Sequence, residues 1–190
     1  ADLVVHLPLR YEDETRLTAI RDALPGVPAQ FEVEVISGEV AYRPRRQLVA
    51  KVRDESGLLV LRFLNFYPSQ QKALAAGARL RVFGEVRGGF FGSDEIIHPR
   101  FHVVHDDEPL PKGLTPIYPT TAGLGQATLR KLIDRAIDSV PLDDTLPESL
   151  RTRLGLPELA ASIRTLHHPS PEISLEQLET VGEPDRHPDE

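Results

Sequence analysis

One short stretch of the sequence concentrates side chains that suit the binding of nucleic acid. Its members, within five consecutive positions, are Tyr42, Arg43, Arg45 and Arg46. A guanidinium group is planar and donates two hydrogen bonds at once, which fits the oxygens of a phosphate. An aromatic ring offers a face on which an unpaired base stacks, worth roughly 1–3 kcal/mol per base. The stretch therefore predicts contact with a nucleic-acid strand.

A second candidate group lies in the run from Leu58 to Tyr67. Strand alternation places Phe63 in a core and leaves Phe66 and Tyr67 at the strand exit, where their rings can reach a base. The competing interpretation is that both rings cap the end of the fold against the helix that follows. The residues predicted to contact nucleic acid, taken over both groups, are Tyr42, Arg43, Arg45, Arg46, Arg62, Leu64, Phe66 and Tyr67.

The distribution of charge supports this prediction, although the total does not. The chain carries a net charge of -7, which by itself disfavours a polyanionic partner. Residues 41–103, however, contain 11 lysines and arginines against 5 acidic residues, whereas residues 1–40 and 104–190 are both acidic. Screening limits the reach of a charge to about 10 Å in ordinary salt. The local excess of positive charge, and not the total charge, therefore determines the affinity for nucleic acid. A solvated sheet surface is the alternative explanation of the basic block.

Other patterns lack the geometry that catalysis or cofactor binding requires. The sequence contains no Gly-Lys pair, so it lacks the phosphate loop of ATPases. Gly123-Leu124-Gly125 follows no buried strand, which favours a helix entry turn over a dinucleotide site. His98 and His102 share a strand face but would lie about 13 Å apart, too far for one tetrahedral metal. His167 and His168 precede a proline and indicate a helix end, so no catalytic residue, cofactor or metal ligand is predicted.

Composition narrows the class of protein further. The sequence has no cysteine, which removes disulfides and thiolate sites and fits a reducing cytoplasm. No apolar run approaches the roughly 20 residues that a membrane-spanning helix needs, and the first ten residues lack the features of a signal peptide. Methionine is also absent, even at position 1, as in a clipped chain or a piece of a longer one. A soluble monomer is expected.

Five strands and one short helix are predicted in the middle of the chain. Apolar and polar residues alternate in each strand, as in a sheet with one buried face, and Asp54-Glu55-Ser56-Gly57 forms a hairpin turn. The strands are predicted at 31–42, 48–53, 58–66, 79–87 and 95–104, with the helix at 69–75. A helix between the third and fourth strands is the order of the OB-fold, a barrel that commonly binds oligonucleotides and elsewhere serves as a sugar- or protein-binding scaffold.

The predicted fold class is mainly β with an α-helical appendage, in three parts. Residues 1–28 are a lead-in that ends at a proline- and glycine-rich break. Residues 29–105 form the five-stranded OB-fold barrel. Residues 106–190 begin as an acidic, extended linker and continue as helices, of which 126–140 carries a clear apolar stripe. Further helices are predicted from 146, over 157–166 and from 174, with a frayed end at 182–190.

The sequence as a whole resembles the wedge domain family of the RecG helicases, bacterial ATP-dependent enzymes that remodel branched DNA. No single segment is specific, but their order and spacing together are, and they cover nearly the whole chain. The segments are Leu7-Pro8-Leu9-Arg10-Tyr11-Glu12-Asp13, Asp54-Glu55-Ser56-Gly57, Phe63-Leu64-Asn65-Phe66, Phe83-Gly84-Glu85-Val86-Arg87, Ile97-His98-Pro99, Leu114-Thr115-Pro116-Ile117-Tyr118-Pro119-Thr120-Thr121, Gly123-Leu124, Leu129-Arg130-Lys131-Leu132-Ile133 and Leu166-His167.

The resemblance implies a role at replication forks and Holliday junctions, in DNA repair and recombination. In the family, the wedge sits at the branch point and splits the parental duplex while two motor domains pull DNA past it. Aromatic residues near the end of the third strand stack on unpaired template bases. The family often has two adjacent aromatics before the asparagine, whereas this chain has Phe63 and then Leu64, which shifts the stacking role toward Phe66 or Tyr67.

The resemblance also implies partners outside this chain. The motor domains, with their ATP and magnesium sites, would follow residue 190, so this chain is expected to bind branched DNA with single-stranded character but to lack enzymatic activity. The helices after residue 105 would connect the wedge to the motor. Two other classes stay open: a protein-binding scaffold on the same fold, and a complete enzyme with an unrecognised site.

Overall fold

The computed structural model describes residues 2–43, 45–89, 93–105, 108–121 and 123–180. The chain divides into two compact units. Residues 14–110 form the first, here called the sheet unit, and residues 1–13 together with 111–190 form the second, the helical unit. The predicted frayed end at 182–190 lies outside the described residues. No described helix is long and apolar enough to cross a membrane.

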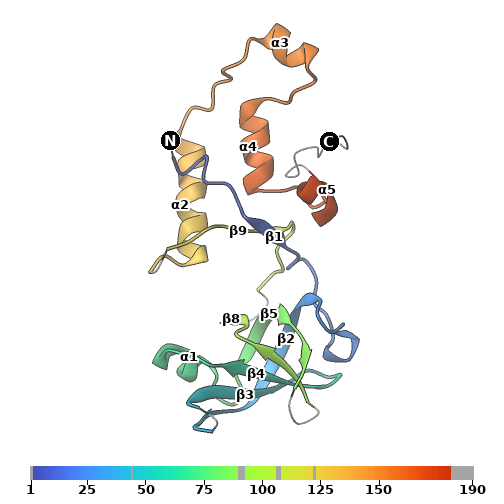
Figure 1. Ribbon diagram of the computed structural model, residues 1–190, viewed down its shortest axis with the longest axis vertical. Coiled ribbons are helices and arrows are strands. Elements are labelled where there is room, and N and C mark those ends of the chain that lie inside the picture. Colours follow the sequence, from blue (N-terminus) through green and yellow to red (C-terminus); the bar gives the residue numbers. More distant parts are fainter. Residues whose placement is uncertain (1, 44, 90–92, 106–107, 122, 181–190) are drawn as a thin grey trace, which may run out of the picture. The chain divides into compact units, whose positions relative to one another are not determined.

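The sheet unit is built on seven strands in the order β6-β7-β4-β3-β2-β5-β8. Figure 1 labels β2, β3, β4, β5 and β8 among them. All neighbouring pairs are antiparallel except β4 and β7, which are parallel. The unit's strands and helices are β2 (Pro28–Ala41), β3 (Gln47–Arg53), β4 (Leu58–Phe63), α1 (Pro68–Ala73), β5 (Arg79–Glu85), β6 (Arg87–Gly88), β7 (Asp94–Ile97) and β8 (Arg100–Val103), preceded by the 3-10 turn η1 (Ile20–Asp22).

The predicted fifth strand is broken in two, and the sheet is not closed. The sequence predicts one strand over 95–104, whereas the structure has β7 and β8 separated by His98 and Pro99. His98 has φ 52°, in the left-handed region, and Pro99 has no N–H to continue a ladder. As a result β7 pairs with β4 at one end of the strand order and β8 with β5 at the other. The OB-fold class is confirmed, with this open barrel as the difference.

Strand β2 is the longest strand because it serves two partners. Its first half, 28–34, pairs with β5, and its second half, 34–41, pairs with β3. The register with β3 shifts between Val35 and Ser37, as at a bulge, which bends the strand. Gly38 follows the bend and lies against the end of α1, where a Cβ would overlap the carbonyl oxygen of Leu74. The close approach therefore requires glycine.

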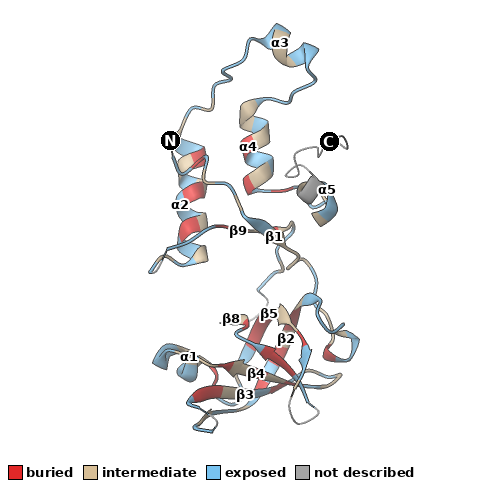
Figure 2. Ribbon diagram, in the orientation of Figure 1, coloured by how far each residue is buried: buried red, intermediate tan, exposed pale blue. Residues whose placement is uncertain are grey.

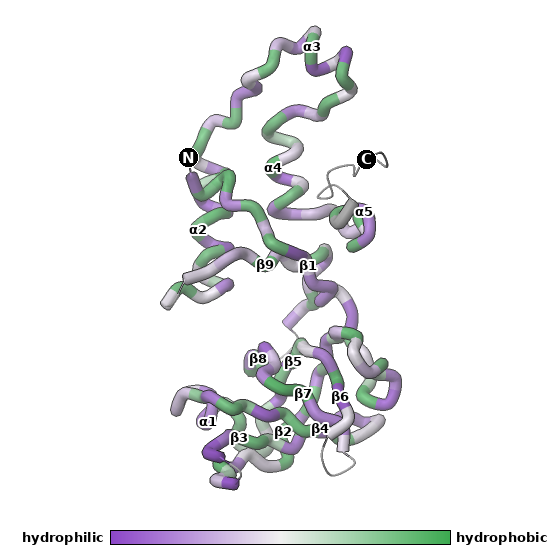
Figure 3. Tube along the Cα trace, viewed as in Figure 1, coloured by the Kyte–Doolittle hydropathy of each residue, from purple (hydrophilic) through white to green (hydrophobic). Residues whose placement is uncertain are grey.

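The sheet's core consists of the apolar residues that the alternation predicts (Figures 2 and 3). They alternate with charged positions along much of β2, β3 and β5, and with less buried positions along β4. The turn at Asp54 also forms as predicted: its carboxylate accepts backbone hydrogen bonds from Ile20, Ser56 and Gly57. The largest buried side chains of this core are Phe31, Phe63, Leu48, Leu59, Leu61, Leu74, Leu80 and Ile96.

The helical unit joins the two ends of the chain. Strand β1 (Arg10–Glu12) pairs antiparallel with β9 (Thr115–Ile117). An apolar cluster contains Val4, Tyr118 and residues of the first and third helices that follow. The helices, at the predicted places within about two residues, are α2 (Gln126–Ser139), α3 (Glu148–Arg153), α4 (Leu159–His167) and α5 (Leu175–Thr180).

Two parts of the predicted division are therefore arranged differently. Residues 2–13 of the lead-in belong with the helices, because β1 pairs with β9 over a separation of more than a hundred positions. Residues 14–28 instead belong to the sheet unit, where Gln30 donates to the carbonyl of Glu14 at 2.8 Å. The acidic linker residues 106–107 lie outside the described residues.

A buried histidine links α4 to the N-terminal segment and to the segment after β9. His167 is fully buried at the end of α4. Its Nε2 lies 2.8 Å from the carbonyl oxygen of Val4, which only accepts, so Nε2 carries the proton. Nδ1 is then the acceptor for the hydroxyl of Tyr118, at 2.8 Å. Burial lowers the pKa of His167 and raises that of Tyr118, so both groups are neutral around pH 7.

Replacing Gly38 should destabilise the sheet unit. We expect Gly38→Ala to lower the free energy of unfolding by about 1–3 kcal/mol, because the added methyl must displace backbone at Leu74. Gly88→Ala is the matched control, since a Cβ there would meet no atom within 4 Å. Urea unfolding followed by circular dichroism checks both, and equal midpoints for Gly38→Ala and the parent chain would contradict the packing described here.

Acid should weaken the helical unit through His167. Its folded pKa lies below the usual 6.5, so the unfolded chain binds more protons between the two values. The histidine's contribution to stability is therefore complete above pH 6.5 and is lost as the pH falls toward the folded pKa. An NMR titration of the imidazole carbons should give a midpoint below 6.5 for His167. A midpoint at or above 6.5 would rule out the neutral, buried pairing with Val4 and Tyr118.

Candidate nucleic-acid interface

The first predicted group forms an exposed loop between β2 and β3. We call residues 42–46 the arginine loop. Tyr42 is 72% exposed, and Arg43, Arg45 and Arg46 are all exposed as well, while Pro44 lies outside the described residues. The loop begins where β2 leaves its pairing with β3, at Ala41 opposite Gln47. It therefore presents three guanidinium groups and one ring to solvent.

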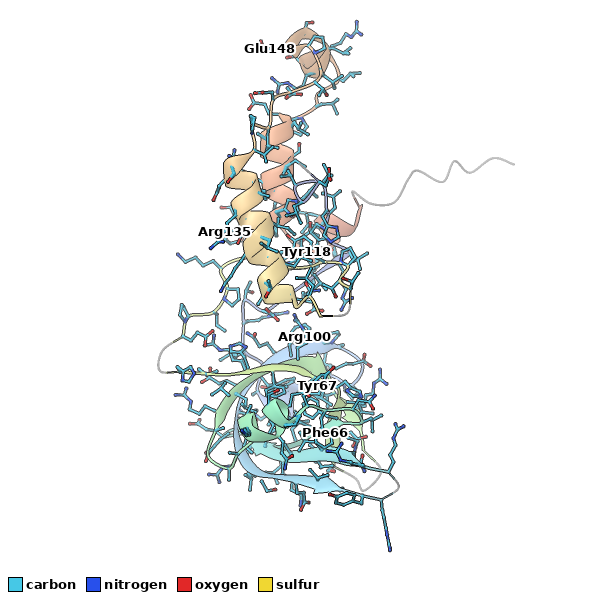
Figure 4. All side chains as sticks on the ribbon, turned by 90° about the vertical axis from the view of Figure 1, so that its left-hand side faces the viewer. Phe66, Tyr67, Arg100, Tyr118, Arg135 and Glu148 are labelled. Atoms are coloured by element: carbon cyan, nitrogen blue, oxygen red, sulfur yellow. The ribbon has the colours of Figure 1, made fainter. Side chains whose placement is uncertain are left out.

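The second predicted group lies at the junction of β4 and α1. Phe66 is half-buried against the core, and Tyr67 is 75% exposed (Figure 4). The backbone N–H of Tyr67 donates to the side-chain oxygen of Gln70 at 2.9 Å, and Pro68 occupies the first turn of α1. The helix start thus fixes the backbone that carries the exposed ring. Phe66 packs inward, as the capping interpretation expects, while Tyr67 faces solvent. Contact of either ring with a base stays a prediction.

A contact between an arginine and an aromatic ring joins the two groups. The guanidinium carbon of Arg46 lies 4.2 Å from the centroid of the Phe66 ring, within range for a cation–π interaction. Such a contact at an exposed site is worth about 0.5–1 kcal/mol. Residues twenty positions apart in sequence are therefore adjacent in the structure. The arginine loop and residues 64–67, which follow β4 and are here called the β4 exit, form one surface.

Arg62 and Leu64 have different surroundings. The Arg62 side chain is 20% exposed and pairs with Glu95 at 2.9 Å. Leu64 is half-buried, and its N–H lies 3.4 Å from Nε2 of His98. The ring of His98 also meets the edge of Phe63. Of the eight predicted contacts, Arg62, Leu64 and Phe66 are the three that are not fully exposed. All eight remain predictions.

Charge compensation separates the arginine loop from the rest of the sheet unit. Most arginines on the strands lie within 4 Å of a carboxylate: Arg53 with Glu34, Arg62 with Glu95, Arg79 and Arg81 with Glu32, Arg87 with Glu85, and Arg100 with Glu14. Among the described residues of this unit, Arg43, Arg45, Arg46, Lys51 and Lys72 have no such partner. The uncompensated positive charge therefore includes the whole arginine loop. Sequence reasoning missed Lys51 and Lys72, although Lys51 alternates outward in a predicted strand.

The face of the sheet unit where arginines pair with carboxylates, here called the charge-paired face, differs from the arginine loop in its net charge. A groove of about 550 Å³ is lined by both signs of charge. The hydrogen bond from Arg79 holds the pKa of Glu32 below its usual value, so this carboxylate stays ionised. Its negative charge offsets the positive charge of Arg79 and Arg81. In the part of the chain that the structure describes, no three acidic or histidine side chains gather as a metal would need. The groove's lining residues are Glu32, Val33, Glu34, Arg53, Asp54, Glu55 and Arg79.

Comparison with known proteins gives consistent matches along the chain. A family model described as the RecG wedge domain matches residues 1–140. The ATP-dependent DNA helicase RecG of Escherichia coli K12 is 43% identical over 188 residues, which is 96% of this chain and 27% of that protein. RecG of Haemophilus influenzae is 40% identical, with the same two coverages of 96% and 27%. The chain thus spans about a quarter of the length of these relatives.

A solved structure also matches beyond the sheet unit. The structure of RecG bound to a three-way DNA junction has a TM-score of 0.68 and 26% identity to this chain. The match covers 94% of this chain and 24% of that one. It therefore includes helices of the helical unit as well as the open barrel.

Proposed function

The chain belongs to the RecG wedge domain family, and on that premise we propose that it binds branched DNA at the branch point. The observation that carries the proposal is the contact of Arg46, one of three uncompensated arginines in the loop, with the ring of Phe66, next to the exposed ring of Tyr67. Arginines that lack carboxylate partners are free to neutralise phosphates. The exposed ring of Tyr67 beside them provides the stacking face that an unpaired base needs.

The geometry gives the arginine loop and the two rings after β4 different roles. The arginine loop would hold the backbone of the DNA, because its guanidinium groups project from a turn rather than from a paired face. Tyr67 would stack on a base exposed at the junction, with Phe66 supporting Arg46 beneath it. A duplex without a branch offers phosphates but no unpaired base. The surface should therefore bind a fork more tightly than a duplex.

The activity of a longer protein is proposed from the relatives. They are ATP-dependent DNA helicases, and this chain spans 27% of the E. coli protein. ATP, magnesium and the translocating motor would belong to the remainder, and this chain would act as the wedge that separates strands during fork regression in DNA repair and recombination. We propose a monomer that acts in the bacterial cytoplasm.

Fluorescence anisotropy of the chain with a model fork, a matched duplex and a single strand tests the proposal. Binding should be tightest to the fork and should weaken as salt rises. Equal, weak and salt-insensitive binding to all three would oppose it and favour the alternative of a protein-binding scaffold on the same fold.

Removing one loop arginine should weaken all DNA binding. We expect Arg45→Ala to lower affinity for fork and duplex alike and to reduce the slope of log affinity against log salt by about 1, because one phosphate contact is lost. Arg53→Ala is the matched control: Arg53 is exposed on the same unit but paired with Glu34. The same titrations in several salt concentrations measure both. Equal slopes for Arg45→Ala and the parent chain, with the fold intact, would remove the loop from the interface.

Removing the exposed ring should act on fork preference instead. We expect Tyr67→Leu to lower the preference for fork over duplex by about 1–3 kcal/mol, the value of one stacked base, with the salt slope unchanged. Phe66→Leu should instead lower affinity for fork and duplex alike, because it acts through Arg46. Leu58→Ala, an exposed apolar residue at the other end of β4, is the control. A fork preference that survives Tyr67→Leu would place base stacking elsewhere.

A further inference from the structure

A chain of polar side chains with little exposure leads from β7 to the arginine loop. Gln47, the first residue of β3, is 4% exposed, and Glu95 on β7 is 5% exposed. The amide nitrogen of Gln47 donates to the backbone carbonyl of Arg43 at 3.1 Å, and its amide oxygen accepts from Nη1 of Arg62 at 3.0 Å. Arg62 then donates to Glu95 from Nε at 3.0 Å and from Nη2 at 2.9 Å.

This arrangement limits the ability of Arg62 to bind a phosphate. Its charge is matched by a buried carboxylate, so a phosphate would have to compete with Glu95 for the same donors. The amide oxygen of Gln47 takes another of its N–H groups. Arg62 is therefore poorly placed to bind DNA directly, in contrast to Arg45, which has no carboxylate partner among the described residues.

The same arrangement restrains the loop. Strand pairing restrains the backbone of Gln47, because Gln47 pairs with Ala41 and its neighbour Leu48 pairs with Phe63. Its side chain holds the loop at Arg43, and the Phe66 ring holds the loop at Arg46. A satisfied buried network is rigid, and rigid loops bind with less loss of conformational entropy.

We propose that Gln47, Arg62 and Glu95 are positioning residues that hold the arginine loop in its DNA-binding conformation. The inference rests on the proposed function and deepens it: Arg62 acts through the loop and not by contact with phosphate. A loosened loop still carries its three guanidinium groups, so the number of phosphate contacts stays the same while the affinity falls.

The first test is Gln47→Leu, which removes the link to the loop without changing charge. Affinity for the fork should fall about three- to tenfold, the worth of one hydrogen bond, with an unchanged salt slope. Gln30→Leu is the matched control, because Gln30 is also 4% exposed and also donates to a backbone carbonyl, that of Glu14. It should lower stability without changing fork affinity.

A second readout follows the loop itself. The chain has four tyrosines and no tryptophan, so fluorotyrosine labelling gives few fluorine signals. In Gln47→Leu the signal of Tyr42 should shift or broaden while that of Tyr67 stays in place. An unchanged Tyr42 signal would overturn the positioning role whether or not the chain binds DNA. Failure of the parent chain to bind DNA would instead overturn the proposed function and leave the fluorine result standing.

The double variant Arg62→Leu with Glu95→Leu separates positioning from contact. It removes both charges together, so no buried charge is left unpaired, and circular dichroism verifies the fold. Positioning predicts reduced fork affinity with an unchanged salt slope. A slope smaller by about 1, as for loss of a phosphate contact, would overturn the inference and make Arg62 a direct contact.

Discussion

The antiparallel register of β3 and β4 is the constraint on which the candidate site depends. Leu48 pairs with Phe63, the last residue of β4. Whatever precedes β3 and whatever follows β4 must therefore emerge at the same end of the sheet. The arginine loop precedes one strand and Phe66 and Tyr67 follow the other, so the pairing brings them together before any side chain interacts. The bend in β2 then allows the strand before the loop to bind β5 as well.

Pairing of charges decides where the field of the sheet unit is positive. Glutamates on β2 neutralise arginines on β3 and β5, and a glutamate on β7 neutralises Arg62. The exposed pair of Arg53 with Glu34 adds little stability, about 0–1 kcal/mol, but every one of these pairs removes positive charge from the flanks of the sheet. The arginines of the loop keep theirs. The acidic total of the chain and a local affinity for phosphate are thus compatible.

Features that depend on local periodicity could be predicted from the sequence, and features that depend on distant pairing could not. The core positions Phe31, Leu61 and Leu80 follow from alternation, and the helix at 126–139 follows from its apolar stripe. The compensation of Arg62 could not be foreseen, because Glu95 is 33 positions away and reaches it only through the parallel pairing of β7 with β4. The burial of His167 depends in the same way on the first residues of the chain, which β1 and β9 bring to it.

The account's central claim is that DNA contacts the arginine loop and the β4 exit and not the charge-paired face. Amide chemical-shift mapping of the chain on addition of a three-way DNA junction tests this most directly. The account predicts the largest shifts at residues 42–43, 45–47 and 64–67, with small shifts on β5 and around Glu32 and Arg79. Shifts centred on the groove of Glu32 and Arg79, with the arginine loop unaffected, would contradict it.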